Sequence, residues 1–330
     1  MISGLTCLRW GFAAGLLLIA AGVGLAQTPS QALFVVLENE KMVAIVDPAS
    51  GKIAGRVPTD ENPNGVAATP DGRLAITANL RPGTLSVIDV AARRERRVNV
   101  GRGSQPNDIL ASGGKFFFTA RGYKAVGRFD PATNDLDWFG VGQNETHILA
   151  VSGNGTIFAS NRGSNSVSII EGAQAGPSKW TVTNIPISAS PDGVALSADG
   201  RELWAGIQGG GGLAVIDVAS RKVSRINVAF QKASPDGSQA ARLQISPDGR
   251  RAFLLNRPTQ EVVVVDTMGR KEIKRFKLAG QSILSAPNGR TYVSVADEGY
   301  IAVIDSQKLE ISGKIQMGGS PNAMAWAGGK

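Results

Sequence analysis

The sequence predicts an all-β protein, a seven-bladed β-propeller made of four-stranded antiparallel blades. Three observations predict it. A hydrophobic strand ending in an acid recurs seven times, strand-like segments and tight turns fill each interval, and the two ends of the chain supply complementary parts of one blade. The composition agrees, because 42% of the 330 residues are hydrophobic and 41 are glycines. Such a chain is typical of short buried strands joined by turns.

The recurring strand sets the period of the repeat. Its seven instances are Val43–Asp47, Leu85–Asp89, Val126–Asp130, Val167–Glu171, Leu213–Asp217, Val262–Asp266 and Ile301–Asp305. Successive instances lie about 40 residues apart, which is the length of one propeller blade. We expect each terminal acid to accept hydrogen bonds from the backbone of the turn that follows it. Seven copies around a ring cannot all serve one site, so this role is structural.

One unit shows all four strands of a blade. Residues Pro63–Gly72 give an inner strand and a Pro-Asp-Gly turn, and Arg73–Asn79 give a second strand. Thr84–Asp89 form the third strand and Arg94–Val100 the outer one. Proline suits the first corner of such a turn, and glycine tolerates the positive φ that follows.

The two ends of the chain complete each other. The first strand-like segment, Ala32–Leu37, has no inner strand before it, and the last, Ser320–Trp326, matches an inner strand with no blade after it. Pairing these segments would close the ring and remove two exposed sheet edges. We therefore expect seven blades, one of them built from both ends.

The repeat resembles the YVTN-type β-propeller repeat, a group that includes lactonase-like seven-bladed propellers. Ser190–Arg201 followed by Gly212–Val218 carries the resemblance most clearly, and the match spans about residues 31–328. The literal YVTN-like tetrapeptides are degraded here, as in Tyr292–Val295. The resemblance implies the seven-bladed fold and says little about function.

The N-terminal segment has the pattern of a secretory signal. Arg9 precedes an uninterrupted apolar stretch, Trp10–Ala26, which ends in small residues. We interpret residues 1–26 as a cleaved signal peptide and residues 27–330 as one propeller, which predicts a periplasmic or secreted protein with no transmembrane helix after cleavage. An uncleaved anchor is the alternative, although the stretch is shorter than the about 20 residues that span a bilayer.

Composition restricts the chemistry. The only cysteine, Cys7, leaves with the signal, so disulfides and thiolate chemistry are not expected in the mature chain. A single histidine also argues against zinc or copper sites. The net charge of +8 favours anionic partners. Nucleic acid is a weak candidate, because no aromatic residues alternate with the basic ones to stack on bases.

Polar side chains gather in the loops expected at one face of the propeller channel. The candidate ligand-binding residues are Arg81, Arg121, Arg162, Arg257, Asn107 and His147. Four arginines at one rim would suit a carboxylate, a phosphate or a sugar acid, because guanidinium binds such groups with two parallel hydrogen bonds. The alternative is that they are ordinary solvated loop residues.

Catalytic and metal sites have weaker support. His147 could act as a base with Glu145 or Asp108 as its partner, but no Gly-x-Ser-x-Gly motif supplies a nucleophile. A calcium ion would need oxygen ligands, and the candidates are Glu38, Asn107, Asn161, Asp192 and Asp297. Such a site would be similar, by architecture only, to the cation site of gluconolactonase-like propellers.

These observations favour an exported, non-catalytic binding module for an anionic ligand or a protein partner at the channel face. Two alternatives remain open. One is a lactonase- or gluconolactonase-like hydrolase with a divalent cation in the channel, and the other is an accessory protein of a periplasmic redox system that contains a quinoprotein.

Overall fold

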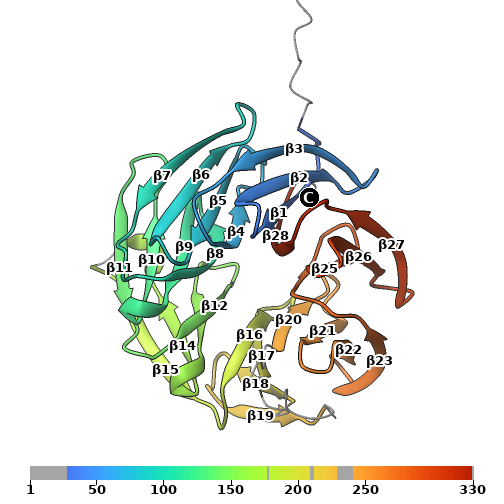
Figure 1. Cartoon of the computed structure of the whole chain (residues 1–330). Coiled ribbons are helices and arrows are strands. Elements are labelled where there is room, and N and C mark those ends of the chain that lie inside the picture. Colours follow the sequence, from blue (N-terminus) through green and yellow to red (C-terminus); the bar gives the residue numbers. More distant parts are fainter. Residues whose placement is uncertain (1–27, 177, 209–211, 229–240, 329–330) are drawn as a thin grey trace, which may run out of the picture.

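The protein forms a ring of seven blades around a central channel (Figure 1). The computed structural model describes residues 28–176, 178–208, 212–228 and 241–328. Within them each blade is a four-stranded antiparallel sheet, as the repeat predicts. We number the blades 1 to 7 in chain order of their second strands, so that blade 1 contains β28, β1, β2 and β3, and blade 2 contains β4 to β7.

Each blade contributes one strand to each of four positions. The inner strands are β28 (Pro321–Ala327), β4 (Pro63–Ala68), β8 (Pro106–Ser112), β12 (Thr146–Val151), β16 (Pro191–Leu196), β20 (Ala241–Ile245) and β24 (Ser282–Ser285). The second strands are β1 (Ala32–Leu37), β5 (Leu74–Asn79), β9 (Lys115–Ala120), β13 (Ile157–Asn161), β17 (Glu202–Ile207), β21 (Arg251–Asn256) and β25 (Arg290–Val295). The third strands are β2 (Met42–Asp47), β6 (Thr84–Asp89), β10 (Ala125–Phe129), β14 (Ser166–Glu171), β18 (Leu213–Asp217), β22 (Glu261–Asp266) and β26 (Tyr300–Asp305). The outer strands are β3 (Lys52–Pro58), β7 (Arg94–Asn99), β11 (Leu136–Gly140), β15 (Thr181–Pro186), β19 (Val223–Ile226), β23 (Lys271–Lys277) and β27 (Glu310–Gln316).

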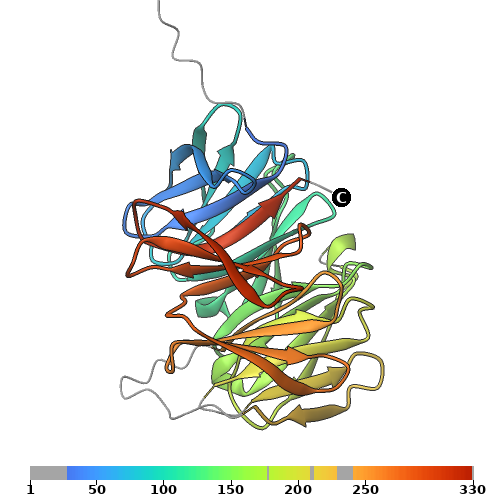
Figure 2. The same cartoon turned by 90° about the vertical axis from the view of Figure 1, so that its right-hand side faces the viewer.

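The C-terminal strand closes the ring. β28 pairs antiparallel with β1, with Leu33 opposite Trp326 and Val35 opposite Met324. In Figure 2 the red C-terminal strand accordingly lies against the blue N-terminal strands. Every residue of β1 is buried, so without β28 an apolar strand would have an open edge. The predicted closure is confirmed.

The turn chemistry also follows the sequence. Asp47 ends its strand and accepts a hydrogen bond of 2.9 Å from the amide of Ala49, and Asp89 accepts one of 2.9 Å from Ala92. Equivalent bonds form at Asp130, Asp217, Asp266 and Asp305. The seventh acid, Glu171, instead lies 3.5 Å from Arg221 in the next blade. The predicted structural role is therefore confirmed for six of the acids, and the longer glutamate side chain reaches a different partner.

Apolar side chains fill the space between neighbouring blades. Between blades 2 and 3, for example, Phe116 and Phe118 of β9 pack against Ile76 of β5. The Phe118 ring leaves no room for a side chain at position 127, because a Cβ atom on Gly127 of β10 would lie 2.2 Å from it. Such contacts bury large aromatic groups and hold the blades at fixed angles around the channel.

The expected signal peptide, residues 1–26, lies outside the described residues. In the part of the chain that the structure describes, we find no helix long and apolar enough to cross a membrane.

Candidate functional site at one end of the channel

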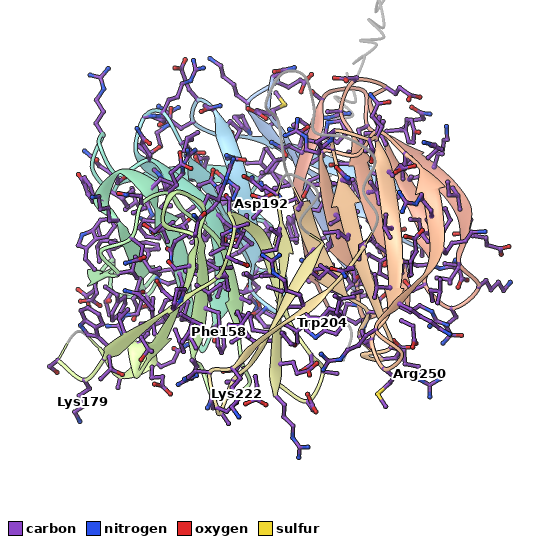
Figure 3. The ribbon with its side chains drawn as sticks, turned by 90° about the horizontal axis from the view of Figure 1, so that it is seen from below. Phe158, Lys179, Asp192, Trp204, Lys222 and Arg250 are labelled. Carbon is purple, nitrogen blue, oxygen red and sulfur yellow. The ribbon has the colours of Figure 1, made fainter. Side chains whose placement is uncertain are left out.

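A ring of polar side chains surrounds one end of the channel. We call the face where the inner strands begin the upper face and the opposite one the lower face. Figure 3 shows Asp192 inside the ring and Lys179, Lys222 and Arg250 at the lower face. Six inner strands carry a polar residue at their second position, and these form the polar ring: Asn64, Asn107, His147, Asp192, Arg242 and Asn322.

Hydrogen bonds run along this ring from one blade to the next. The Asn64 side-chain amide donates to Oδ1 of Asn107 over 2.9 Å, and the Asn107 amide donates to the backbone carbonyl of His147 over 3.1 Å. One blade beyond His147, Oδ2 of Asp192 accepts a bond of 2.9 Å from the amide of Ala241 in the following blade. These bonds tie inner strands together where no sheet hydrogen bonds connect them, and they fix the side chains rigidly.

Asp192 lies at the centre of a charged group that we call the Asp192 cluster: His147, Arg162, Asp192 and Arg242. Its side chain is fully buried, and its Oδ1 lies 2.8 Å from Nδ1 of His147. Nε of Arg162 is 4.0 Å from Oδ1, and Nε of Arg242 is 3.9 Å from Oδ2. The cluster thus joins blades 4, 5 and 6 around one buried carboxylate.

Local backbone structure positions these side chains. Asp192 sits in an irregularity of the register between β16 and β17, and the hydroxyl of Ser160 donates a 2.7 Å hydrogen bond to its carbonyl. Arg162 begins a short 3-10 helix, η2 (Arg162–Ser164), and its amide donates to the carbonyl of Glu145. This helix has only three residues and is followed by Asn165 in a left-handed conformation, after which the chain enters β14. Arg162 therefore lies in the short connection at the upper face.

Burial and charge set the protonation of the cluster. Burial lowers the pKa of His147 to about 4, and the two nearby guanidinium groups add to this effect. The imidazole is therefore neutral near pH 7. Burial raises the pKa of Asp192, but His147, Arg242 and Arg162 together outweigh burial and hold it well below its usual range. The carboxylate is therefore ionised, and the cluster carries one negative and two positive charges.

The neighbours of the imidazole also fix its tautomer. Nη1 of Arg162 lies 3.4 Å from Nε2 of His147. A guanidinium can only donate, so Nε2 accepts and Nδ1 carries the proton toward Asp192. The contact between Nδ1 and Oδ1 is short, but its alignment does not make a well-formed hydrogen bond. We therefore treat it as an electrostatic contact that orients the ring.

The two arginines keep unused hydrogen-bonding capacity. Nε of Arg162 and Nε of Arg242 have no hydrogen-bond partner among the described residues. These two Nε atoms are buried, but the side chains are 28% and 24% exposed, so other atoms of each arginine remain accessible. Each guanidinium has five donors, and a single carboxylate cannot satisfy both groups. The arrangement can accept an additional anionic group.

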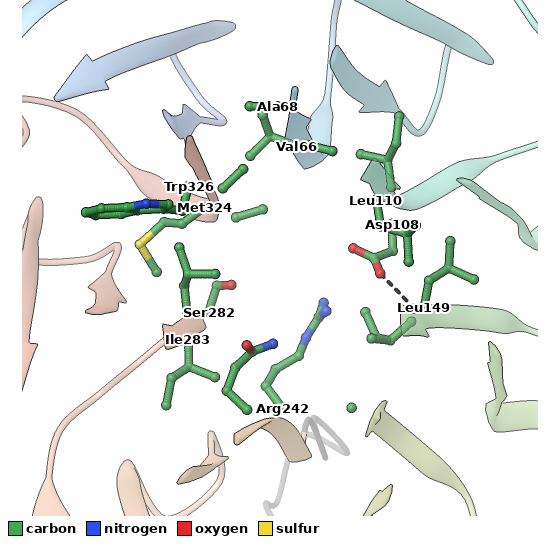
Figure 4. Close-up of a pocket in the computed structure, with 18 of the residues that line it drawn as sticks. Val66, Ala68, Asp108, Leu110, Leu149, Arg242, Ser282, Ile283, Met324 and Trp326 are labelled. Atoms are coloured by element: carbon green, nitrogen blue, oxygen red, sulfur yellow. Dashed lines mark hydrogen bonds between the residues drawn. The ribbon is translucent and has the colours of Figure 1, made fainter. Parts of the chain in front are cut away.

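Of the four residues of the Asp192 cluster, Arg242 lines a cavity of about 360 Å³. Arg242 and Asp108 both project into it, from β20 and β8 (Figure 4). Oδ2 of Asp108 accepts a 2.8 Å hydrogen bond from the amide of Leu149, and burial raises the pKa of Asp108 to about 6. Apolar side chains such as Val66, Leu110 and Ile283 share the wall with the polar residues Gln244 and Ser282. The site therefore combines charged groups with a chamber that has both apolar and polar walls.

The structure brings some of the predicted residues together and separates others. His147, Arg162 and Asp192 form the cluster, Asn107 touches it through His147, and Asp108 faces the adjoining cavity. Glu145 lies at the rim, 3.6 Å from Arg121, so these two charges offset each other. Arg81 and Arg257 follow β5 and β21 on other blades, and Arg81 is exposed.

The candidate metal ligands are spread over several blades. Glu38 accepts hydrogen bonds from Asn62 and Asn322, and Asn161 donates to Ser166 and Ser168 in its own blade. Asp297 follows β25, and Asp192 is surrounded by cationic groups. Among the described residues, no group of three or more histidine, cysteine, aspartate or glutamate side chains could hold a metal ion.

Sequence reasoning missed Arg242. The signal was available, since Arg242 is the second residue of an inner strand, the position occupied by Asn107, His147 and Asp192 in earlier blades. Residues 234–237 repeat the Ser-Pro-Asp-Gly sequence of residues 190–193, but β20 begins at Ala241, so this sequence does not mark Arg242.

Comparisons with known proteins agree with the fold. A family model described as YNCE-like beta-propeller matches residues 10–322.

Hydrazine synthase of Kuenenia stuttgartiensis is similar in structure, with a TM-score of 0.70, 19% identity, and coverage of 83% of this chain and 92% of that chain. A candidate 6-phosphogluconolactonase from Bacteroides uniformis has a TM-score of 0.72 at 14% identity, covering 90% and 99%. AztD of Citrobacter koseri has a TM-score of 0.67 at 11% identity, covering 91% and 98%. At these identities the likeness extends to the fold alone. Among curated proteins, none matches the sequence significantly.

Proposed function

The chain belongs to the YNCE-like beta-propeller family, and from that premise we propose that it is a binding module for a small anionic ligand held at the upper end of its channel. The Asp192 cluster is the binding site in this proposal. Arg162 and Arg242 contact the anion, and Asp192 and His147 hold the two arginines in place.

One observation carries the proposal. Two arginines from different blades flank a single buried carboxylate at about 4 Å, and their side chains are still 28% and 24% exposed. With His147 neutral, the cluster has an excess of one positive charge. A carboxylate or phosphate would satisfy the unused donors with charge-assisted hydrogen bonds. The cavity of about 360 Å³ limits the ligand to a small molecule.

Titration calorimetry with gluconate and 6-phosphogluconate tests the proposal. We expect binding, and we expect Arg162→Ala and Arg242→Ala each to weaken it by about 10- to 100-fold, because a hydrogen bond to a charged group contributes about 1.5–3 kcal/mol. Arg201→Ala is the matched control, since Arg201 is 84% exposed at the lower face. Absence of binding for both anions, or arginine variants that bind like the control, would contradict the proposal.

Lactone hydrolysis is the second candidate. It is favoured by the neutral His147 imidazole beside a buried carboxylate, although Nε2 can accept a proton only when Arg162 releases it. The Bacteroides uniformis neighbour is described as a candidate 6-phosphogluconolactonase. The test is hydrolysis of glucono-δ-lactone above the spontaneous rate, with and without calcium. Turnover that is lost in His147→Ala and kept in Arg201→Ala would establish catalysis. Absence of turnover in the wild-type protein would contradict the hydrolase and favour the binding module. The accessory role in a redox system remains a prediction.

A further inference from the structure

Asp108 places a second charge in the cavity, facing the same space as Arg242 (Figure 4). It is the third residue of β8, where the neighbouring inner strands carry Gly65 and Ile148. A carboxyl group therefore stands at a level of the channel where the adjacent blades present small or apolar residues. Nothing in the repeat requires it there.

The two opposite charges do not neutralise each other directly. Among the described residues, the ion pairs of Arg242 include Asp192, and none joins Arg242 to Asp108. The carboxylate of Asp108 has a backbone amide as partner, that of Leu149, but no cationic group in contact. Because burial raises the pKa of Asp108 to about 6, its charged form is disfavoured by its surroundings and would be stabilised by an added cation.

Apolar side chains line part of the cavity that holds the two charges. Val66, Leu110, Leu149 and Ile283 line the same cavity, whose volume is about 360 Å³. A ligand that carried only a negative charge would leave Asp108 unpaired and would be repelled by it. A ligand with one charge of each sign and an apolar body would match all three features.

We propose that the ligand is a zwitterion, a small amino acid or short peptide whose carboxylate binds Arg242 and Arg162 while its ammonium group binds Asp108 and its apolar part fills the cavity. This inference rests on the proposed anion site and adds the recognition of a cationic group. It assigns Asp108 a binding role that is separate from the Asp192 cluster.

Matched ligands separate the two halves of the site. We would titrate the purified protein with 6-aminohexanoate and leucine as zwitterions, with hexanoate and 4-methylpentanoate as their anionic counterparts, and with hexylamine as a cation. The two zwitterions differ in the separation of their charges. We expect at least one of them to bind about tenfold or more tightly than its anionic counterpart, the gain expected of one charge-assisted hydrogen bond.

Asp108→Asn tests the residue itself. Asparagine keeps an oxygen that can accept the Leu149 amide, so the variant should fold. It should lose the preference for the zwitterion and bind hexanoate about two- to threefold more tightly, because a like charge is removed. Arg201→Ala should retain the wild-type preference.

The outcomes distinguish this inference from the proposed function. If the wild-type protein binds each zwitterion and its anionic counterpart with equal affinity, the zwitterion proposal is wrong but the proposed anion site is unaffected. This comparison needs no variant. Binding of neither zwitterion also overturns the zwitterion proposal. Failure of both gluconate and 6-phosphogluconate to bind removes the proposed function as well.

Discussion

Two carboxylates near the upper face, Glu38 and Asp192, show how the same group can serve structure or binding. Glu38 follows β1 and accepts hydrogen bonds from the side-chain amides of Asn62 and Asn322, at 3.1 and 2.7 Å. It thereby connects blades 1 and 2 at the closure of the ring. Asp192 is surrounded by an imidazole and two guanidinium groups, and the guanidinium donors are not used up.

The difference lies in the donors. Two neutral amides each donate one hydrogen bond to Glu38, and they leave no unpaired cation beside it that could bind an anion. Charged guanidinium groups stand about 4 Å from Asp192 and have further donors. A carboxylate with satisfied amide donors therefore indicates a structural link, whereas one that holds several partly used cations indicates an anion site.

The largest effect is expected from removing the strand that Glu38 helps to hold. A chain ending at Gly319 lacks β28, so the buried strand β1 loses its partner and Glu38 loses Asn322. We expect no cooperative unfolding transition when the far-ultraviolet circular dichroism is followed during heating. A chain ending at Gly328 is the control and should melt like the full protein. Cooperative melting of the shorter chain would show that closure is dispensable.

The next effect concerns Asp192. Asp192→Asn keeps the oxygen that accepts the Ala241 amide but leaves two arginines without their counter-charge. We expect a loss of about 3 kcal/mol in the free energy of unfolding at pH 7, the usual cost of breaking a buried ion pair. Urea denaturation measures it.

The pH dependence of this loss has a definite sign. The pKa of Asp192 is lowered in the folded protein, so its contribution is fully present above the unfolded pKa of 3.8 and is lost as the pH falls through the folded value. The difference between wild type and Asp192→Asn should therefore shrink below about pH 4. A difference that stays constant at acid pH would mean that the charge of Asp192 does not stabilise the fold.

Most of the fold could be predicted because the repeat encodes it locally. The acids that end the third strands and the Pro-Asp-Gly turns act within a few residues, so their partners, such as Ala49 for Asp47, follow from the sequence. Ring closure was also predictable, because Ser320–Trp326 has the pattern of an inner strand without a blade.

The site was less predictable because it depends on contacts between blades. His147 was named as a ligand-binding residue and a candidate base, and Asp192 as a candidate metal ligand, but nothing in their spacing showed that they touch. Their approach depends on the irregular registers at the start of β12 and β16. These registers are set by packing around the channel and not by the local pattern.

A third carboxylate, Asp108, should behave in the opposite way to Asp192. Burial raises its pKa from 3.8 to about 6, and of the charged groups that act on it Arg242 lowers the pKa whereas Asp192 raises it. Between these values the folded protein keeps a proton that the unfolded chain has released, so stability falls as the pH rises. Asp108→Asn should therefore be more stable than wild type at pH 8, and no more stable at pH 4.

The size of that gain depends on the exposure of the carboxylate. A shift of two pKa units corresponds to about 3 kcal/mol. Because Asp108 faces the open channel, we expect solvent to reduce the gain to about 1–2 kcal/mol. Urea denaturation at pH 4 and pH 8 checks it. A variant that is less stable than wild type at pH 8 would show that the Asp108 carboxylate stabilises the fold.

The smallest effect should come from Glu38→Gln, and it tests the comparison from its structural side. Glutamine keeps one acceptor oxygen but turns an NH₂ group toward Asn62 or Asn322, so one amide donor loses its partner. Since Glu38 is partly exposed, water can replace that partner, and we expect a loss of about 1 kcal/mol at pH 7 with no change in anion affinity. Glu40→Gln, an exposed neighbour, should change stability by less than about 0.5 kcal/mol. If Glu38→Gln cost as much as Asp192→Asn, or weakened anion binding, the two carboxylates would share one role and the distinction between amide-held and arginine-held carboxylates would fail.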